Sequence, residues 1–245
     1  MNATLRGLIG TAAAIALAAA GVSSALPSSA ATGPSTPIEH IIGGSSASSP
    51  YIVQLQFRQA GGTYGCTGEA ISPEWVITAQ HCTDGDTFMN VYYSNDTGNP
   101  GTPVAANAVY GSPNGDVGLI HLGAPTPVSS YGQLANAYTA SSGDSGAIWG
   151  YGLRANQARA DHLYMADISV LGASTDAYGG TAVHIQGVTG SSNHGDSGGP
   201  LIIGGVIVGV CSTGDQADPG ADIHARSNYA NLTGSRSWIA STSGV

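Results

Sequence analysis

The chain of 245 residues is long enough for one large domain or two small ones, and its net charge of −9 argues against a nucleic-acid partner, because it repels phosphate backbones. Charged residues make up only 9% of the chain, against about 25% in an ordinary soluble domain, and all six basic residues are arginine. The 37 Gly and 12 Pro residues indicate many turns, but the absence of a Gly-X-Y period excludes collagen, and a hydrophobic share of 42% excludes wholesale disorder.

The first 40 residues have the pattern of a targeting segment. Arg6 precedes an apolar run over 7–22, and its length of about 16 residues is short of the roughly 20 that span a bilayer. Small residues then offer cleavage sites near 23–25 and 28–30. We predict a secretory signal peptide over 1–25, with its end between 25 and 31, and a propeptide rich in Pro, Ser and Thr over 26–40. An N-terminal membrane anchor is the alternative.

From residue 50 onward the pattern is that of an all-β protein. Short β-prone runs alternate with clusters of Gly, Asn, Ser, Pro and Asp, and they lie at 51–57, 75–78, 88–93, 117–122, 147–151, 183–188 and 201–210. This spacing predicts a sandwich or barrels, and periodicity alone does not separate the two. A helical pattern follows at the end of the chain, around 234–241.

Three short motifs in a defined order carry candidate chemistry. Thr-Ala-Gln-His-Cys lies over 78–82, Asn-Gly-Asp-Val over 114–117, and Gly-Asp-Ser-Gly-Gly-Pro over 195–200. Together they resemble the chymotrypsin-like (trypsin-like) serine peptidases, in which the chain order is His, then Asp, then Ser. The resemblance covers about 41–241. It implies two packed six-stranded antiparallel β-barrels, about 41–130 and 131–230, and a short C-terminal helix, with 41–245 as the peptidase domain.

The resemblance also implies the roles of single residues. A serine hydroxyl is a poor nucleophile until a base takes its proton, and a histidine titrates near neutral pH. Ser197 is thus the expected nucleophile and His81 its base, while Asp116 fixes the imidazole tautomer. The backbone N–H groups of Gly195 and Ser197 are the expected oxyanion hole.

Each motif alone has an ordinary interpretation. Gly-Asp-Ser-Gly also occurs over 143–146, where no Gly-Pro follows, and there we predict a solvated turn before a strand. Only the joint occurrence of the three motifs, in order, is specific.

The segment Ile-Ile-Gly-Gly over 41–44 resembles the mature N-terminus of this family, which is freed when a propeptide is cut. Here the cut falls after His40. The resemblance implies that the new α-ammonium of Ile41 folds inward and pairs with Asp196. Because a buried charge pair is stable only when both partners are present, we expect the uncut chain to have a malformed pocket.

Cys66 and Cys82 are the expected disulfide by the same resemblance, since their spacing alone does not determine the pairing. The bond is expected to staple the loop that carries His81. Zinc bound by Cys66, His81 and Cys82 is the alternative, but it lacks a fourth ligand. Cys211 is left over and is expected to be a small buried hydrophobe.

The primary pocket is predicted from the resemblance. Ser191, six residues before the nucleophile, takes the position where aspartate marks cleavage after Arg or Lys, and Gly214 and Gly220 leave the pocket open. This combination favours aromatic or large apolar side chains, unless the Asp222 carboxylate turns inward and selects basic ones. The remaining expected pocket residues are Ser192, Ser212 and Thr213.

We therefore predict a secreted serine endopeptidase that cleaves proteins or peptides through an acyl-enzyme. We expect no metal, organic cofactor, membrane or nucleic-acid partner, and we expect a monomer for which proteinaceous protease inhibitors are candidate partners. Two alternatives are a catalytically silent homologue that binds a partner through the same cleft and a serine esterase. The esterase is disfavoured because His precedes Ser here, whereas the chain order in the α/β-hydrolases is Ser, then Asp or Glu, then His.

Overall fold

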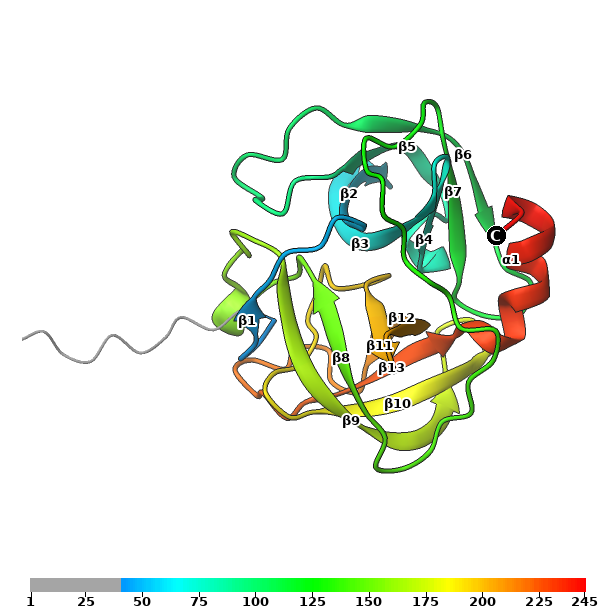
Figure 1. Cartoon of the computed structure of the whole chain (residues 1–245). Coiled ribbons are helices and arrows are strands. Elements are labelled where there is room, and N and C mark those ends of the chain that lie inside the picture. The colour runs from blue at the N-terminus through cyan, green and yellow to red at the C-terminus, as the bar shows by residue number, and fades with distance from the viewer. Residues whose placement is uncertain (1–40) are drawn as a thin grey trace, which may run out of the picture. The chain divides into compact units, whose positions relative to one another are not determined.

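The computed structural model describes residues 41–245, so the predicted signal peptide and propeptide over 1–40 lie outside the described residues. Two closed six-stranded antiparallel β-barrels follow one another along the chain, and the short helix α1 (Arg236–Ser243) comes last (Figure 1). The all-β fold predicted from the pattern and the two six-stranded barrels implied by the resemblance are confirmed.

The first barrel closes in the order β2-β3-β4-β7-β6-β5. Apolar side chains at alternate positions of its strands point inward, as Val53, Leu55 and Phe57 do on β2. The 3-10 helix η1 (Gln80–Cys82) follows β4 at one end of the barrel. The strands are β2 (Ile52–Gln59), β3 (Gly62–Ser72), β4 (Trp75–Thr78), β5 (Asp86–Tyr92), β6 (Val104–Gly111) and β7 (Gly118–Leu122).

The second barrel closes in the order β8-β9-β10-β13-β12-β11, with β11 paired back to β8. The short strand β1 (Ser45–Ser46) pairs with β9, so the segment before β2 belongs to this barrel's sheet, although 41–130 is the range expected for barrel one. Two further 3-10 helices are η2 (Ala155–Gln157) and η3 (Leu232–Ser235). The strands are β8 (Ser145–Gly150), β9 (Tyr164–Thr175), β10 (Thr181–Gly187), β11 (Pro200–Ile203), β12 (Val206–Gly214) and β13 (Arg226–Asn231).

The apolar run over 201–210 forms two strands where one was predicted. Gly204 and Gly205 have φ of +60° and +83°, and Ile203 pairs with Val206 across them. A two-residue hairpin turn of type I′ needs positive φ at both central positions, which glycine adopts without a Cβ clash. The run therefore turns back on itself into β11 and β12.

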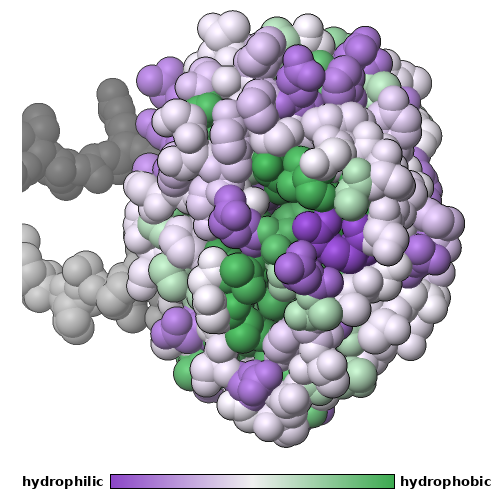
Figure 2. All heavy atoms as spheres, turned by 45° about the vertical axis from the view of Figure 1, so that its right-hand side comes forward, coloured by the Kyte–Doolittle hydropathy of each residue, from purple (hydrophilic) through white to green (hydrophobic). Residues whose placement is uncertain are grey.

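An apolar cluster joins the two barrels to α1. Its fully buried members come from the first barrel (Ile71, Ile77, Val117, Leu119), from the second (Ile207, Val210, Ala230) and from the C-terminal segment (Leu232, Ile239). Figure 2, in which the side of α1 is turned forward, shows a mostly polar or pale surface on which apolar residues gather in one band. Packing through this cluster holds the loops of the two barrels against each other.

Candidate active site

Loops from both barrels meet at the candidate site. His81 lies in η1, directly after β4, and Asp116 lies in the turn that precedes β7. Ser197 lies in the loop between β10 and β11 of the second barrel. His81 and Ser197 line the same pocket, so the structure brings all three predicted residues together.

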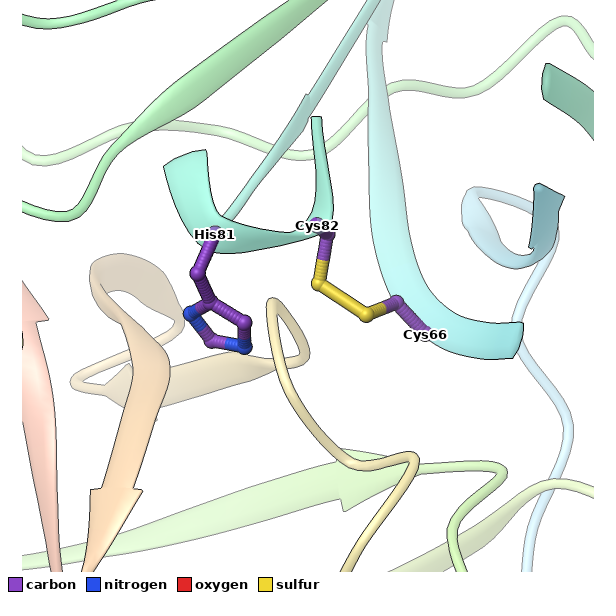
Figure 3. Close-up of side chains that lie close together, drawn as sticks. All are labelled: Cys66, His81 and Cys82. Carbon is purple, nitrogen blue, oxygen red and sulfur yellow. A yellow bond between two sulfur atoms is a disulfide. The ribbon is translucent and has the colours of Figure 1, made fainter. Parts of the chain in front are cut away.

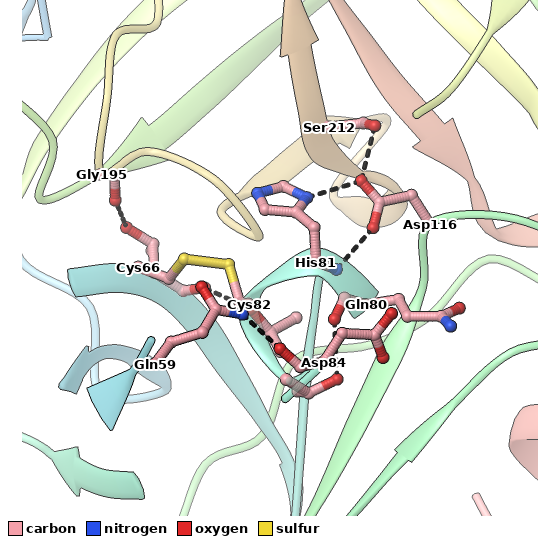
Figure 4. The surroundings of a disulfide bond; sticks show 12 residues. Gln59, Cys66, Gln80, His81, Cys82, Asp84, Asp116, Gly195 and Ser212 are labelled. Carbon is pink, nitrogen blue, oxygen red and sulfur yellow. Dashed lines mark hydrogen bonds and ion pairs between the residues drawn. A yellow bond between two sulfur atoms is a disulfide. The ribbon is translucent and has the colours of Figure 1, made fainter. Parts of the chain in front are cut away.

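The ring of His81 is held by Asp116. His81 Nδ1 is 2.7 Å from Asp116 Oδ2, and the His81 backbone N–H donates to Asp116 Oδ1 at 2.9 Å (Figure 4). Because an ionised carboxylate only accepts hydrogen bonds, Nδ1 carries the proton and Nε2 is left as an acceptor. The His81 side chain is 31% exposed and that of Asp116 is 0% exposed, so one edge of the ring faces the pocket.

The second barrel also binds Asp116. The Ser212 hydroxyl on β12 donates to Asp116 Oδ2 at 2.6 Å, and the Asp116 backbone N–H donates to Asp176 Oδ2 at 3.0 Å. A buried carboxylate is costly unless donors compensate for lost water. Ser212 and His81 supply those donors to the Asp116 carboxylate, and the Asp116 N–H supplies one to Asp176.

Asp176, between β9 and β10, is a site residue that the sequence analysis missed. The nearest signal is Gly115, with φ of +141°, where a Cβ would lie 2.4 Å from Asp176 Oδ2. Glycine at this position thus allows the close approach of the two loops.

The loop around Ser197 is a tight turn pinned between the barrels. Gly195 and Gly198 have φ of +95° and +78°, and a Cβ on Gly198 would lie 2.0 Å from Thr78 Oγ1. The Thr67 N–H donates to Ser197 O at 2.9 Å, which ties the loop to β3. Within residues 41–245, the N–H groups of Gly195 and Ser197 donate to no other group of the protein, so both are available to an oxyanion.

A pocket of about 310 Å³ opens beside His81 and Ser197. Four of the predicted pocket residues line it, namely Ser192, Ser212, Thr213 and Gly214. The other lining residues, which were not predicted from the sequence, are Asn193, His194, Cys211, Gln216, Ala217, Pro219, Ala225 and Arg226. The lining contains no carboxylate.

Ser191, Gly220 and Asp222 are not among the described residues that line this pocket. The Ser191 hydroxyl donates to the main-chain oxygen of Asp222 at 2.7 Å. The Asp222 side chain is exposed, and its Oδ1 accepts from the His224 N–H at 2.9 Å. The carboxylate therefore belongs to a surface turn.

Asp196 is buried directly beside the nucleophile. Its two oxygens accept from the backbone N–H groups of Gly152 and Asn193, each at 2.8 Å. Burial raises the pKa of Asp196 to about 7, and these two hydrogen bonds offset part of the shift.

Ile41 lies in the apolar core of the second barrel and is 1% exposed. The backbone oxygen of the next residue, Ile42, accepts from the Ser191 N–H at 2.8 Å. The 41–44 segment therefore lies beside the loop segment that leads to Asp196. Ile41 itself has a φ of +36°, which is uncommon for a β-branched residue.

Cys66 and Cys82 form a disulfide that links β3 to η1 beside His81 (Figure 3). The pairing implied by the resemblance is confirmed. The two sulfur atoms lie near the His81 ring, but they are bonded to each other. Zinc binds the thiolate form of cysteine, so this bond argues against the zinc alternative. Cys211 is a free, buried thiol whose pKa is raised to about 12 by burial.

The second Gly-Asp-Ser-Gly string, over 143–146, has different surroundings from the string at 195–198. Gly143 and Ser145 are exposed at a turn that enters β8, and the Tyr138 hydroxyl donates to Asp144 Oδ2 at 2.7 Å. It is a matched internal control for the string at 195–198.

Comparison with known proteins decides the family. The trypsin family model matches residues 41–239. This chain belongs to the trypsin family. It is 30% identical over 206 residues to brachyurin of Leptuca pugilator, and the match covers 74% of this chain and 89% of brachyurin. It is also 30% identical over 206 residues to trypsin-3 of Salmo salar, and that match covers 74% of this chain and 84% of trypsin-3. An uncharacterized peptidase of Corynebacterium glutamicum is 30% identical over 205 residues, covering 80% of this chain and 69% of that protein.

The trypsin-like chain has no helix, within the part that the structure describes, of the length and apolar character that crossing a membrane requires.

Proposed function

We propose that this chain is a secreted serine endopeptidase that hydrolyses peptide bonds through an acyl-enzyme on Ser197. The observation that carries the proposal is the His81–Asp116 pair, 2.7 Å between Nδ1 and Oδ2, on the pocket that Ser197 also lines. The family of the chain supports the same chemistry and implies protein substrates.

The proposed reaction uses this pair, the Ser197 hydroxyl and two backbone N–H groups. As Ser197 Oγ attacks the substrate carbonyl carbon, its proton passes to His81 Nε2, and the carbonyl oxygen becomes an oxyanion. The N–H groups of Gly195 and Ser197 stabilise that charge, and losing one such donor costs about 2.7–4 kcal/mol. His81 then gives its proton to the leaving amine, and Asp116 stabilises the imidazolium in between. Water releases the acyl group by the same steps.

We propose a preference for a large apolar or aromatic residue before the cleaved bond. A buried Lys or Arg side chain is costly without a carboxylate partner, and the pocket lining holds none. Arg226 lies at the lining, which further opposes a basic side chain. The alternative, selection of basic residues by Asp222, is less favoured, because that carboxylate is exposed and accepts from the His224 N–H.

We further propose that residues 1–25 are a signal peptide and 26–40 a propeptide, and that a cut after His40 activates the enzyme. The raised pKa of Asp196, about 7, is consistent with a buried carboxylate that gains from a cationic partner such as the α-ammonium of Ile41. The active form is expected to be a monomer that protein inhibitors can block.

The first test uses Ser197→Ala and, as its matched control, Ser145→Ala in the exposed second string. We expect Ser197→Ala to abolish peptide hydrolysis with an unchanged circular dichroism spectrum, because the nucleophile is lost, and Ser145→Ala to retain wild-type activity. A fluorophosphonate should form an adduct on Ser197 alone, read by peptide mass spectrometry. Wild-type turnover by Ser197→Ala would exclude the triad, and no adduct in chains that begin at Ile41 would favour a silent binding protein.

A further inference from the structure

A second and larger hollow, of about 760 Å³, opens next to the candidate site. Its walls come from β2 and β3 of the first barrel, from the segment around 97–100, and from the segment between β8 and β9. We call it the 760-Å³ groove. Nothing in the proposed chemistry at Ser197 uses it.

The groove adjoins the pocket beside Ser197. His194 lines both hollows, and Gly195, whose N–H is a proposed oxyanion donor, lines the groove, as does Cys66 of the disulfide. The nucleophile loop therefore stands between the two hollows. A peptide whose acyl part occupies the first pocket continues, on the far side of the cleaved bond, into the groove.

The walls of the groove are aromatic and preformed. Tyr64 is 50% exposed and stacks on Phe57, with ring centroids 6.1 Å apart. The Tyr151 hydroxyl donates to Ile52 O at 3.0 Å and accepts from Asn95 Nδ2 at 2.9 Å, which fixes that ring between the barrels. Concave sites with aromatic walls and a few placed polar groups are typical of ligand-binding pockets.

The charge of the groove differs from that of the whole chain. Arg159 is exposed and is the one Lys or Arg among the described residues that line the groove, and no Asp or Glu lines it. The chain as a whole carries a net charge of −9. A local cation in a carboxylate-free hollow attracts an acidic side chain, and its planar guanidinium can bind a carboxylate through two N–H groups.

We propose that the 760-Å³ groove binds the part of the substrate that follows the cleaved bond and that Arg159 selects an acidic residue there, at the second or third position. This inference rests on the proposed peptidase function and adds a substrate class to it. It is independent of the preference before the cleaved bond, which the other pocket determines.

The test compares peptides that differ only after the cleaved bond. A peptide that the wild-type enzyme cuts at a single bond is found in a mixture, and Glu, Gln or Lys is placed at its second and third positions after that bond. We expect kcat/KM to be at least about fivefold higher for Glu than for Lys at low salt, and the difference to shrink with added salt. Arg159→Lys should keep the preference, Arg159→Gln should remove it, and Arg159→Glu should reverse it.

Two controls separate the possible failures. Arg58→Gln removes the same charge from a surface residue outside the groove lining and is expected to leave the ratio unchanged. A p-nitroanilide of the same acyl sequence has no residues after the bond, so all Arg159 variants should cleave it at the wild-type rate. If the anilide is cleaved but Arg159→Gln keeps the Glu-to-Lys ratio, or Arg58→Gln changes it equally, the groove proposal is wrong and the peptidase proposal stands. If no wild-type protein with an Ile41 terminus cleaves any substrate, the proposed function itself fails.

Discussion

Glu69 is a fully buried carboxyl on β3 of the first barrel. It is 0% exposed, and within residues 41–245 neither of its carboxyl oxygens has a hydrogen-bond partner. On β3 it shares a face with Thr67 and Ile71, toward the interface of the barrels. Burial raises the pKa of Glu69 well above its usual value, so folding favours the neutral form of this carboxyl.

We expect Glu69 to make the fold less stable as the pH rises. The folded pKa lies above the unfolded one, so the contribution to stability is complete below about pH 4, the unfolded pKa, and is lost as the pH rises toward the folded value. Asp196, with a pKa of about 7, acts in the same direction in the uncut chain. In a Ser197→Ala background, which prevents self-digestion, the Tm should fall between pH 5 and pH 9, and Glu69→Gln should flatten that fall.

The matched control is Asp167→Asn, which removes an exposed carboxyl on β9. It should leave the slope of Tm against pH unchanged. An identical slope in Glu69→Gln and in its parent would mean that Glu69 is charged and solvated, contrary to the structure.

At the scale of elements, the hairpin of β3 and β4 with η1 is the unit that places His81. β4 pairs with β3 and β7, and the Cys66–Cys82 disulfide joins the end of η1 back to β3. η1 is a 3-10 helix of three residues and has no side-chain cap at its N-terminus. The disulfide therefore holds η1 in place, whereas a longer helix would be held by its own hydrogen bonds.

Replacing both cysteines, Cys66→Ala with Cys82→Ala, should lower the free energy of unfolding by about 3 kcal/mol, since a closed loop near 16 residues restricts the unfolded chain by that amount. Urea denaturation measures it. Activity should fall as well, because the segment that carries His81 loses its tie to β3.

A reducing agent provides the control for the disulfide, because it should destabilise the wild-type protein and leave the double variant unaffected. A loss of stability in the variant that remains below about 1 kcal/mol would show that packing of β3 against β4 suffices to hold η1.

At the scale of the whole molecule, the site exists only where the two barrels meet. Asp116 from the first barrel is bound by Ser212 and Asp176 from the second, and Ser197 is bound through Thr67 of the first. The N-terminal segment adds a third connection, since β1 pairs with β9 and Ile42 pairs with Ser191. A change at residue 41 is therefore able to reach the nucleophile loop through the second barrel.

We expect the uncut chain to react slowly with a fluorophosphonate and a chain that starts at Ile41 to react at least about fivefold faster. The positive φ of Ile41, +36°, costs about 1–2 kcal/mol for an L-residue and is relieved once the preceding peptide bond is cut. Residues 36–40 are replaced by the recognition sequence of an added protease, and labelling rates are measured before and after that cut.

Asp196→Asn serves as the partner variant, since it removes the carboxylate that we propose as the partner of the new ammonium. After the cut it should still label slowly. Equal labelling of uncut and cut chains would exclude activation by the new terminus, while leaving the proposed roles of His81 and Ser197 intact.

The sequence alone was sufficient for the features that short motifs and period-two patterns carry. The strand at 75–78 lies where the pattern predicts it, the Cys66–Cys82 bond and the barrels agree with the family resemblance, and the helix pattern at 234–241 falls within η3 and α1. These features depend on residues that are neighbours in the chain or on motifs with a known order.

Only the tertiary structure decided what surrounds those motifs. Contacts between segments far apart in the chain determine the surroundings of Asp176 and Glu69, the exposed position of Asp222 and the lining of the 760-Å³ groove. No local period in the sequence encodes which loop of one barrel meets which loop of the other. The sequence does not distinguish a buried carboxylate from a solvated one. The charge and the role of a carboxylate follow from the burial and the donors that folding places around it.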